Sequence, residues 1–228
     1  GLYLLALLGF ALGAASFTSL LPASPLLKFS TLILGLLLMI PALFARHFAI
    51  SKWNYVSSVR RQIFDALALR GDEKVLDVGC GSGALLNAAA KQLTTGKALG
   101  IDIWAPHTGG GNYDLLMKNA KAEGVVNKIE FKQADVRKLP FEDSSFDVIV
   151  SSGALHHIGQ ERSEHEQAIN EMVRVLKPGG KIALMDVTHI IEEYASNMKT
   201  KGITSKVNKT VQSPFNFEMS VMVGKKDK

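Results

Sequence analysis

The stretch VLDVGCGSGALL, from Val75 to Leu86, constrains the fold of this chain more than any other part of its sequence. A short run of apolar, partly β-branched residues leads directly into a loop with glycines at positions 79, 81 and 83, and an alanine-rich helical pattern follows. Because glycine is costly in chain entropy, this loop predicts a place where a ligand or another backbone comes close. A strand, a glycine loop and a helix in this order are typical of a parallel sheet with helices on its faces.

Alternating helical and strand patterns continue over residues 51–228. Apolar residues recur at helical spacing in Val56–Leu69, Ala84–Leu93, Tyr113–Glu123, Glu164–Leu176 and Glu192–Lys201. Apolar and β-branched runs predict strands at Lys74–Gly79, Ala98–Ile103, Lys128–Gln133, Phe146–Ser152, Lys181–Val187, Ile203–Val211 and Phe215–Val223. The predicted fold of residues 51–228 is therefore an α/β domain with a doubly wound, Rossmann-like sheet.

The first 45 residues contain one charged side chain, that of Lys28, and no acidic residue. Two apolar runs, at about residues 2–21 and 26–45, are each long enough to cross a bilayer, which takes about 20 residues. We expect residues 1–46 to form a hairpin of two transmembrane helices around the PASP turn at residues 22–25. A cleaved signal peptide and a buried soluble hairpin are the weaker alternatives, since the first run has no basic start and an uncharged stretch of this length rarely lies in a soluble core.

Basic residues cluster directly after the apolar region, at Arg46, Lys52, Arg60 and Arg61. By the positive-inside rule, this predicts a multi-pass membrane protein with the α/β domain on the cytoplasmic side. The net charge of +5 is not arranged as a basic stripe interleaved with aromatic residues, so we expect no nucleic acid as a partner. The single cysteine, Cys80, excludes an internal disulfide and a cysteine-based zinc site. The sequence leaves the oligomeric state open.

The glycine loop is compatible with more than one ligand. Gly79, Gly81 and Ala84 satisfy the dinucleotide-binding pattern G-x-G-x-x-[GA], which would hold a pyrophosphate at the start of a helix. Asp77 lies two residues before the first glycine, where a carboxylate would repel a pyrophosphate but attract an ammonium or sulfonium group. Asp102 follows about 20 residues later, at the end of the next strand, where an acidic side chain binds ribose hydroxyls.

Five motifs in order, VLDVGCGSG, GIDIW, ADVRKLPF, FDVIVSSGALHHI and LKPGGKIAL, resemble those of class I S-adenosylmethionine-dependent methyltransferases. The resemblance covers about residues 56–223 and is strongest to the ubiquinone/menaquinone-biosynthesis group. It implies a seven-stranded sheet in the order 3-2-1-4-5-7-6, with strand seven antiparallel. The long loop Trp104–Tyr113 and the short segment Thr188–Gly202 depart from the family pattern, so the resemblance does not extend to the acceptor pocket.

The resemblance also implies the cofactor, S-adenosylmethionine, and the product S-adenosylhomocysteine. It places the methionine part of the cofactor at the glycine loop and Asp77, the ribose at Asp102, and the adenine after strand three. The sulfonium would lie after strand four, beside Ser151 and Ser152. The implied cofactor-binding residues are Asp77, Gly79, Cys80, Gly81, Gly83, Asp102, Ile103, Asp135, Val136 and Ser151.

His156 and His157 follow the predicted strand Phe146–Ser152, beside the expected site of methyl transfer. Either histidine is a candidate catalytic base, because its ordinary pKa suits proton transfer near neutral pH. The alternative is that the pair shapes the mouth of the pocket while positioning alone drives the reaction. We expect no metal site, because no metal-ligand spacing is present and one polar cluster is typical of a solvated helix start: Glu161, Glu164, His165 and Glu166.

The predicted function is a membrane-anchored methyltransferase that acts by in-line transfer on a small, lipophilic or membrane-proximal acceptor. Its partners would be that acceptor and the lipid bilayer. A nicotinamide-dependent oxidoreductase is the main alternative, because of the G-x-G-x-x-[GA] pattern. A catalytically silent, cofactor-binding scaffold at the membrane is the other.

Overall fold

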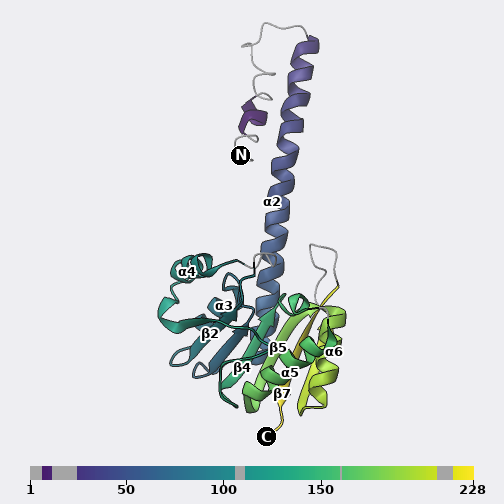
Figure 1. The fold of residues 1–228 in the computed structure, drawn as a ribbon. Coiled ribbons are helices and arrows are strands. Elements are labelled where there is room, and N and C mark those ends of the chain that lie inside the picture. Colours follow the sequence, from purple (N-terminus) through teal and green to yellow (C-terminus); the bar gives the residue numbers. More distant parts are fainter. Residues whose placement is uncertain (1–6, 12–24, 106–110, 160, 210–217) are drawn as a thin grey trace. The chain divides into compact units, whose positions relative to one another are not determined.

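The computed structural model describes residues 7–11, 25–105, 111–159, 161–209 and 218–228 (Figure 1). The chain divides into two compact units, Gly1–Val56 and Ser57–Lys228. The boundary falls inside a helix, α2 (Pro25–Leu67), and not in a linker between residues 46 and 51. Pro41 lies within this helix.

Among the described residues, one helix is long and apolar enough to cross a membrane, the part Phe29–Leu67 of α2, with a mean hydropathy of 2.0 over its most apolar window. The second predicted span, residues 26–45, lies within α2, which does not end at Ala45. Of the first predicted span only residues 7–11 are described, and they are helical; the rest lies outside the described residues. The structure thus gives one such helix where the sequence predicted two.

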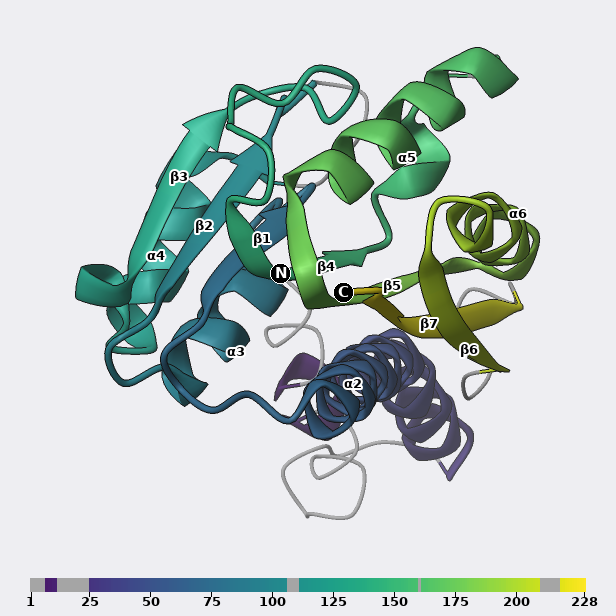
Figure 2. The same ribbon diagram turned by 90° about the horizontal axis from the view of Figure 1, so that it is seen from below.

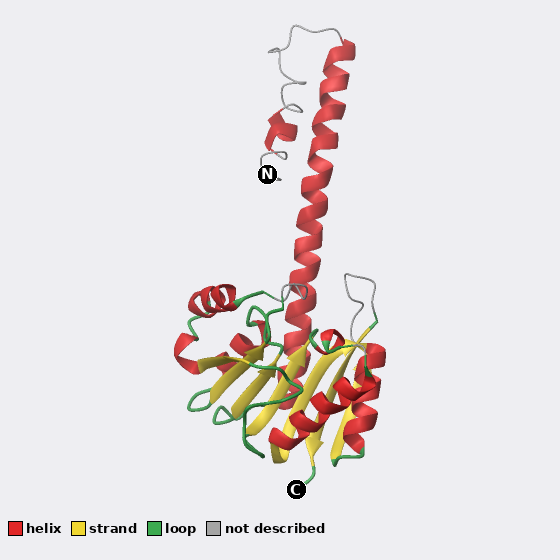
Figure 3. Cartoon of the chain, in the orientation of Figure 1, coloured by secondary structure: helices red, strands yellow, loops and turns green. Residues whose placement is uncertain are grey.

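The Ser57–Lys228 unit is built on a seven-stranded sheet, which Figure 3 shows as one continuous layer. Its strands are β1 (Lys74–Val78), β2 (Lys97–Asp102), β3 (Ile129–Gln133), β4 (Phe146–Ser152), β5 (Leu176–Val187), β6 (Ile203–Lys209) and β7 (Met219–Lys226). The order is β3-β2-β1-β4-β5-β7-β6, and β7 runs antiparallel to both of its neighbours. The predicted strand order is confirmed.

Helices cover both faces of this sheet. Figure 2 shows α3 (Ala84–Gln92) on one face, and α5 (Arg162–Val175) and α6 (Thr188–Lys199) on the other. The last turns of α2 add to the core of this unit, because apolar residues at helical spacing are buried there: Val59, Ile63, Phe64 and Leu67. α4 (Tyr113–Ala122) and two short 3₁₀ turns, η1 (Val126–Lys128) and η2 (Leu155–His157), complete the described elements of this unit.

Two boundaries differ from the sequence prediction for identifiable reasons. β5 begins at Leu176 and not at Lys181, because the segment 177–180 stays extended as an irregular part of the strand. The register with β4 shows this: Phe146 faces Leu176, but Val148 faces Lys181. α6 begins at Thr188 and not at Glu192. The Thr188 hydroxyl is hydrogen-bonded to Ser220 Oγ on β7 at 3.0 Å. The predicted strand ends at 210–211 and 215–217 lie outside the described residues.

Candidate active site

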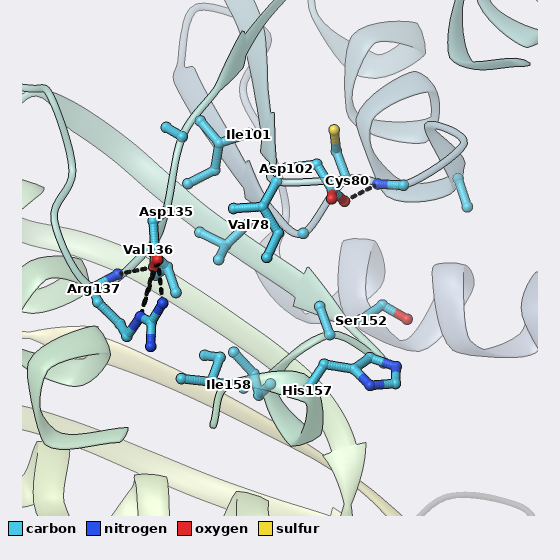
Figure 4. A pocket seen from close by; sticks show the side chains of 18 of the residues that line it. Val78, Cys80, Ile101, Asp102, Asp135, Val136, Arg137, Ser152, His157 and Ile158 are labelled. Atoms are coloured by element: carbon cyan, nitrogen blue, oxygen red, sulfur yellow. Dashed lines mark hydrogen bonds and ion pairs between the residues drawn. The ribbon is translucent and has the colours of Figure 1, made fainter. Parts of the chain in front are cut away.

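A cavity of about 250 Å³ lies at the carboxyl ends of the parallel strands, where doubly wound sheets bind ligands (Figure 4). Its wall comes from the segments that follow four strands. At the ends of β1 and β2 it is lined by residues 79–82 and by Asp102 and Ile103, and at the ends of β3 and β4 by residues 134–137 and 152–155. Its floor and sides are mostly apolar, with side chains that include Val78, Ile101, Val136 and Ile158.

The glycine loop is held close to its neighbours by backbone contacts. Gly79 has a φ of 70°, in the left-handed region, and a Cβ added to it would lie 2.2 Å from Ala154 Cβ. The N–H groups of Gly79 and Cys80 both donate to Ile101 O, at 2.9 Å each. Gly83 N–H donates to Cys80 O at 2.7 Å. Gly79 therefore has no room for a side chain, and much of the loop's donor capacity is already used within the protein.

Asp77 lies behind this loop, on β1, and is 2% exposed. Within the described part of the chain, its Oδ2 atom is buried without a hydrogen-bond partner. Burial raises the pKa of this carboxyl to about 7, and the nearby charge of Asp102 raises it further. The hydrogen bond from the Leu86 backbone N–H acts in the opposite direction and lowers it. A buried, unpaired carboxyl oxygen is an expensive feature, and a cationic ligand group at the loop would compensate it.

Asp102 ends β2 and lines the cavity. Its Oδ2 accepts a hydrogen bond from Gly81 N–H at 2.8 Å, and its Oδ1 accepts one from Trp104 N–H at 2.6 Å. Each carboxylate oxygen has a second lone pair, so this side chain can still accept ribose hydroxyls. The Trp104 ring Nε1–H donates to Gly81 O at 3.2 Å, which ties the segment after β2 to the glycine loop.

Asp135 lines the cavity after β3 and is paired with Arg137, a residue that the sequence analysis missed. Arg137 Nε and Nη2 donate to both carboxyl oxygens of Asp135, and Nη1 contacts Glu164 on α5. Hydrogen bonding to this guanidinium holds the pKa of Asp135 below its usual range. The spacing of two residues within ADVRKLPF, with a carboxylate before an arginine, was the signal that could have revealed the pair.

Three predicted cofactor-binding residues do not line the cavity: Asp77, Gly83 and Ser151. The Ser151 side chain is fully buried, and its hydroxyl donates to Val78 O at 2.8 Å, joining β4 to β1. Ser152, the next residue, does line the cavity. The other seven line it. Burial raises the pKa of the Cys80 thiol, one of these seven, which disfavours the reactive thiolate.

The structure separates the two candidate histidines. His157 lines the cavity, whereas His156 lies beside it, with a ring centroid 3.9 Å from that of His157. His156 Nδ1 lies 2.7 Å from Oδ1 of Asp186, a fully buried residue near the end of β5 that the sequence analysis did not single out. This hydrogen bond raises the pKa of His156, against an opposing effect of burial. Among the described residues, no group of three or more His, Cys, Asp or Glu side chains is placed to hold a metal ion.

This arrangement defines a class of protein. The strand order, the antiparallel β7, the tight glycine loop and acidic residues after β2 and β3 are the features of a class I methyltransferase domain. Residues 76–184 match the family described as "Methyltransferase domain", and the chain carries an S-adenosylmethionine-dependent methyltransferase domain of this kind.

Two curated relatives are similar over most of this domain. The demethylmenaquinone methyltransferase of Lactobacillus johnsonii is 30% identical over 130 residues, which are 57% of this chain and 50% of that protein. The ubiquinone/menaquinone biosynthesis C-methyltransferase UbiE of Pseudomonas fluorescens is 31% identical over 167 residues, 73% of this chain and 57% of that protein. The chain thus spans about half the length of the curated relatives it matches.

Solved structures share the fold at lower identity. The N-methyltransferase NodS from Bradyrhizobium japonicum aligns with a TM-score of 0.61 and 15% identity, covering 77% of this chain and 98% of that one. The [4+2]-cyclase SpnF aligns with a TM-score of 0.60 and 17% identity, covering 74% and 80%. At such identities only the fold is shared, and the different activities for which the two proteins are named illustrate that the fold does not fix the reaction.

The residues present fit S-adenosylmethionine, the cofactor of this family. Asp77 offers an unpaired buried carboxyl oxygen behind the loop, a match for the ammonium of the methionine part. Asp102 has remaining acceptor capacity for ribose hydroxyls. The apolar walls formed by Ile103, Val136 and Ile158 suit a flat purine ring. The loop's N–H groups at 79, 80, 81 and 83 are already bonded within the protein, so these four are not available to a pyrophosphate.

Proposed function

We propose that the chain acts as a membrane-anchored, S-adenosylmethionine-dependent methyltransferase whose acceptor is a small, lipophilic molecule. The observation that carries the catalytic part is the cavity at the ends of β1 to β4, with one unpaired oxygen of the Asp77 carboxyl behind its glycine loop. The relatives named for quinone methylation favour a lipophilic acceptor with an aromatic ring.

In this proposal, the cofactor supplies an electrophilic methyl group on a sulfonium when it is bound. The protein's own residues orient the two reactants. Asp102 and the loop at Gly79 and Gly81 fix the cofactor side, and Ser152 and His157 border the space after β4 where the acceptor would approach. In-line displacement depends chiefly on such alignment and on the exclusion of water.

The anchor part of the proposal rests on α2. Its first 21 residues, Pro25 to Ala45, would extend over about 30 Å, the thickness of a bilayer core. Large apolar side chains are exposed along this stretch, including Phe29, Ile33, Leu37, Ile40 and Phe44. No acidic residue precedes Asp65 in the chain, and the basic residues from Arg46 onward favour a cytoplasmic location for the domain.

Calorimetric titration of the full chain in detergent with S-adenosylhomocysteine tests the catalytic part. Saturable binding is expected, and Asp102→Asn should weaken it roughly tenfold or more, since it removes a charge-assisted acceptor. Asp143→Asn is the matched control, because Asp143 pairs with Arg174 away from the cavity. If the folded wild-type protein does not bind S-adenosylhomocysteine, the proposal fails. Binding of a nicotinamide cofactor instead would favour the oxidoreductase.

Incubation of membrane lipid extract with methyl-labelled S-adenosylmethionine tests the acceptor part. A labelled, lipid-soluble product is expected, and binding of S-adenosylhomocysteine without any labelled product would favour the scaffold.

Carbonate extraction and protease protection of tags at both ends test the anchor. A hairpin puts both tags on the cytoplasmic side, a single span protects the N-terminal tag, and release of the chain by carbonate would exclude the anchor.

A further inference from the structure

A second pair of titratable side chains lies outside the cofactor cavity but next to it. His156, in the turn after β4, is hydrogen-bonded through Nδ1 to Asp186, near the end of β5, at 2.7 Å. Asp186 is fully buried, whereas the His156 side chain is 36% exposed. A buried carboxyl therefore holds one side of a partly exposed imidazole.

The contacts of Asp186 fix which ring nitrogen carries hydrogen. Its Oδ2 accepts the N–H groups of Leu155 at 2.8 Å and His156 at 3.3 Å, and its Oδ1 accepts that of Val187 at 2.7 Å. All of these donors point at carboxyl oxygens, so His156 Nδ1 is the donor in the fourth contact. In the neutral ring, Nε2 then holds a lone pair and can accept a proton. Within the described part of the chain, no hydrogen bond occupies Nε2.

The position of the pair follows from the sheet. The polar groups that fit the cofactor follow β1, β2 and β3, namely the glycine loop, Asp102 and Asp135. An in-line displacement requires the acceptor on the opposite side of the methyl group, and we infer that it approaches from the ends of β4 and β5. The His156–Asp186 pair lies there, since Gly153 N–H donates to Met185 O across the same two strand ends.

We propose that His156 is the general base that deprotonates a hydroxyl group of the acceptor, and that Asp186 is its positioning residue. This inference rests on the proposed methyltransferase function. The acceptor hydroxyl passes its proton to His156 Nε2. The acceptor oxygen, or a ring carbon conjugated with it, forms the bond to the methyl carbon while the carbon–sulfur bond breaks and sulfur keeps the electron pair. An attacked ring carbon returns its own hydrogen to the ring oxygen by tautomerisation, so one proton is released in either case.

The surrounding charges support this assignment. Asp186 faces His156 from β5, and His157 contacts His156 within the same turn. Tyr194 on α6 lies near Asp186, and its pKa is raised chiefly by burial and to a lesser extent by the charges of Asp186 and Glu193. Asp186 favours the imidazolium that forms when His156 takes the proton. Near neutral pH, an arylamine attacks through a lone pair that it already holds, and a thiolate is already deprotonated, so neither needs a base before methyl transfer.

The test uses the full chain in detergent with two ring-matched probes, 1,4-naphthohydroquinone and 1-naphthylamine, and methyl-labelled S-adenosylmethionine. The hydroquinone should be methylated faster, with a rate that rises with pH through the pKa of His156. His156→Gln should lower kcat by roughly 100-fold or more, with KM and the affinity for S-adenosylhomocysteine nearly unchanged. Added imidazole should restore part of the activity of His156→Gly. His189→Gln, at an exposed histidine of α6, should leave activity unchanged.

A readout that needs no turnover is the NMR titration of the His156 ring. Asp186→Asn should lower its pKa, because the charged partner is lost, and should shift the acidic limb of the pH–rate profile to lower pH. Equal methylation of the amine, an unchanged kcat for His156→Gln, or S-adenosylhomocysteine binding without any methylation of the hydroquinone would each overturn the inference. Failure of the wild-type chain to bind S-adenosylhomocysteine would instead overturn the proposed function.

Discussion

The two halves of the strand edge that carries the site are built in different ways. On the side of β1 to β3, backbone N–H groups and a glycine without room for a Cβ hold the loop at Gly79 and Gly81. On the side of β4 and β5, side chains make the decisive contact, between His156 and Asp186. A loop position without room for a Cβ admits only glycine, whereas a side-chain contact can be exchanged for another. The first half therefore suits a ligand common to a family, and the second suits an acceptor particular to each member.

The sharpest way to break the backbone half is Gly79→Ala. The added Cβ would lie 2.2 Å from Ala154 Cβ, at a φ of 70°. Left-handed strain of about 1 kcal/mol and overpacking of about 1–3 kcal/mol should together lower the free energy of unfolding. The shifted loop should also weaken S-adenosylhomocysteine binding by roughly tenfold or more. Thermal unfolding and calorimetry measure the two effects.

Gly124→Ala is the matched control for this prediction. Gly124 also has a φ of 70°, but an added Cβ would meet nothing within 4 Å. It should therefore cost only the strain of about 1 kcal/mol. In a double-mutant cycle, Ala154→Gly should relieve part of the cost of Gly79→Ala, since it removes the colliding methyl group. An equal loss in the free energy of unfolding for Gly79→Ala and Gly124→Ala would contradict the close-packing explanation. So would additive effects of Gly79→Ala and Ala154→Gly.

Asp77 is the exception within the backbone half, because its buried carboxyl is incompletely bonded. Burial raises its pKa in the folded protein from the ordinary value of 3.8 to about 7, so the folded chain holds this proton more tightly than the unfolded chain. Stability is then full below about pH 4 and decreases as the pH rises through 7. Asp77→Asn should remove this decrease, making the unliganded protein more stable at pH 8 by on the order of 2–4 kcal/mol, while S-adenosylhomocysteine binding weakens.

Chemical unfolding at pH 5 and pH 8, with and without S-adenosylhomocysteine, measures both effects of Asp77→Asn. The stabilisation should be seen only at the higher pH and only without ligand. Asp114→Asn, at the start of α4, is the control for removing a carboxylate elsewhere in the domain. A variant that is less stable than wild type at pH 8 would show that Asp77 is not a strained group.

The contrast between the halves also explains what the sequence could predict. The strand order and the residues around the glycine loop were predictable, because they depend on short motifs whose partners lie on neighbouring parallel strands. The Asp135–Arg137 pair joins residues two positions apart, so it could have been predicted from the local sequence. The His156–Asp186 contact joins residues 30 positions apart. It depends on the register of β5, whose irregular start at 176–180 has no local signature.

The length of α2 was missed for a different reason. The change from apolar to charged residues after Ala45 was interpreted as a boundary between elements, but charge alone does not end a helix. Between Pro41 and Gly71 the chain contains neither proline nor glycine, so no residue there interrupts the hydrogen-bond ladder. A change in composition thus marks a change in environment, whereas the end of a helix requires a residue that breaks it.

Ser151 and Ser152 allow a finer comparison, since adjacent residues of β4 serve structure and cavity separately. Ser151→Ala removes a buried hydrogen bond to Val78 O and should cost about 1 kcal/mol of stability, with little change in S-adenosylhomocysteine affinity. Ser152→Ala should weaken S-adenosylhomocysteine binding with little change in stability, because Ser152 lines the cavity. Urea unfolding and calorimetry on both variants give the test. If Ser151→Ala weakened binding more than Ser152→Ala, the assignment of the two serines would have to be exchanged.

The smallest expected effect concerns Arg137, whose side chain pairs with Asp135 on the side of β1 to β3. Its pair with Asp135 is partly exposed on both sides, so Arg137→Gln should change stability by less than about 1 kcal/mol. The pKa of Asp135 is held low in the folded protein, so this stability is present above the carboxyl's unfolded pKa and lost as the pH falls through the folded one. Arg137→Gln should therefore unfold in acid at a slightly higher pH than wild type. Arg162→Gln, which breaks the exposed pair with Glu166, should not shift the acid transition. Coincident acid transitions of all three proteins would mean that Arg137 acts only on the ligand and not on the fold.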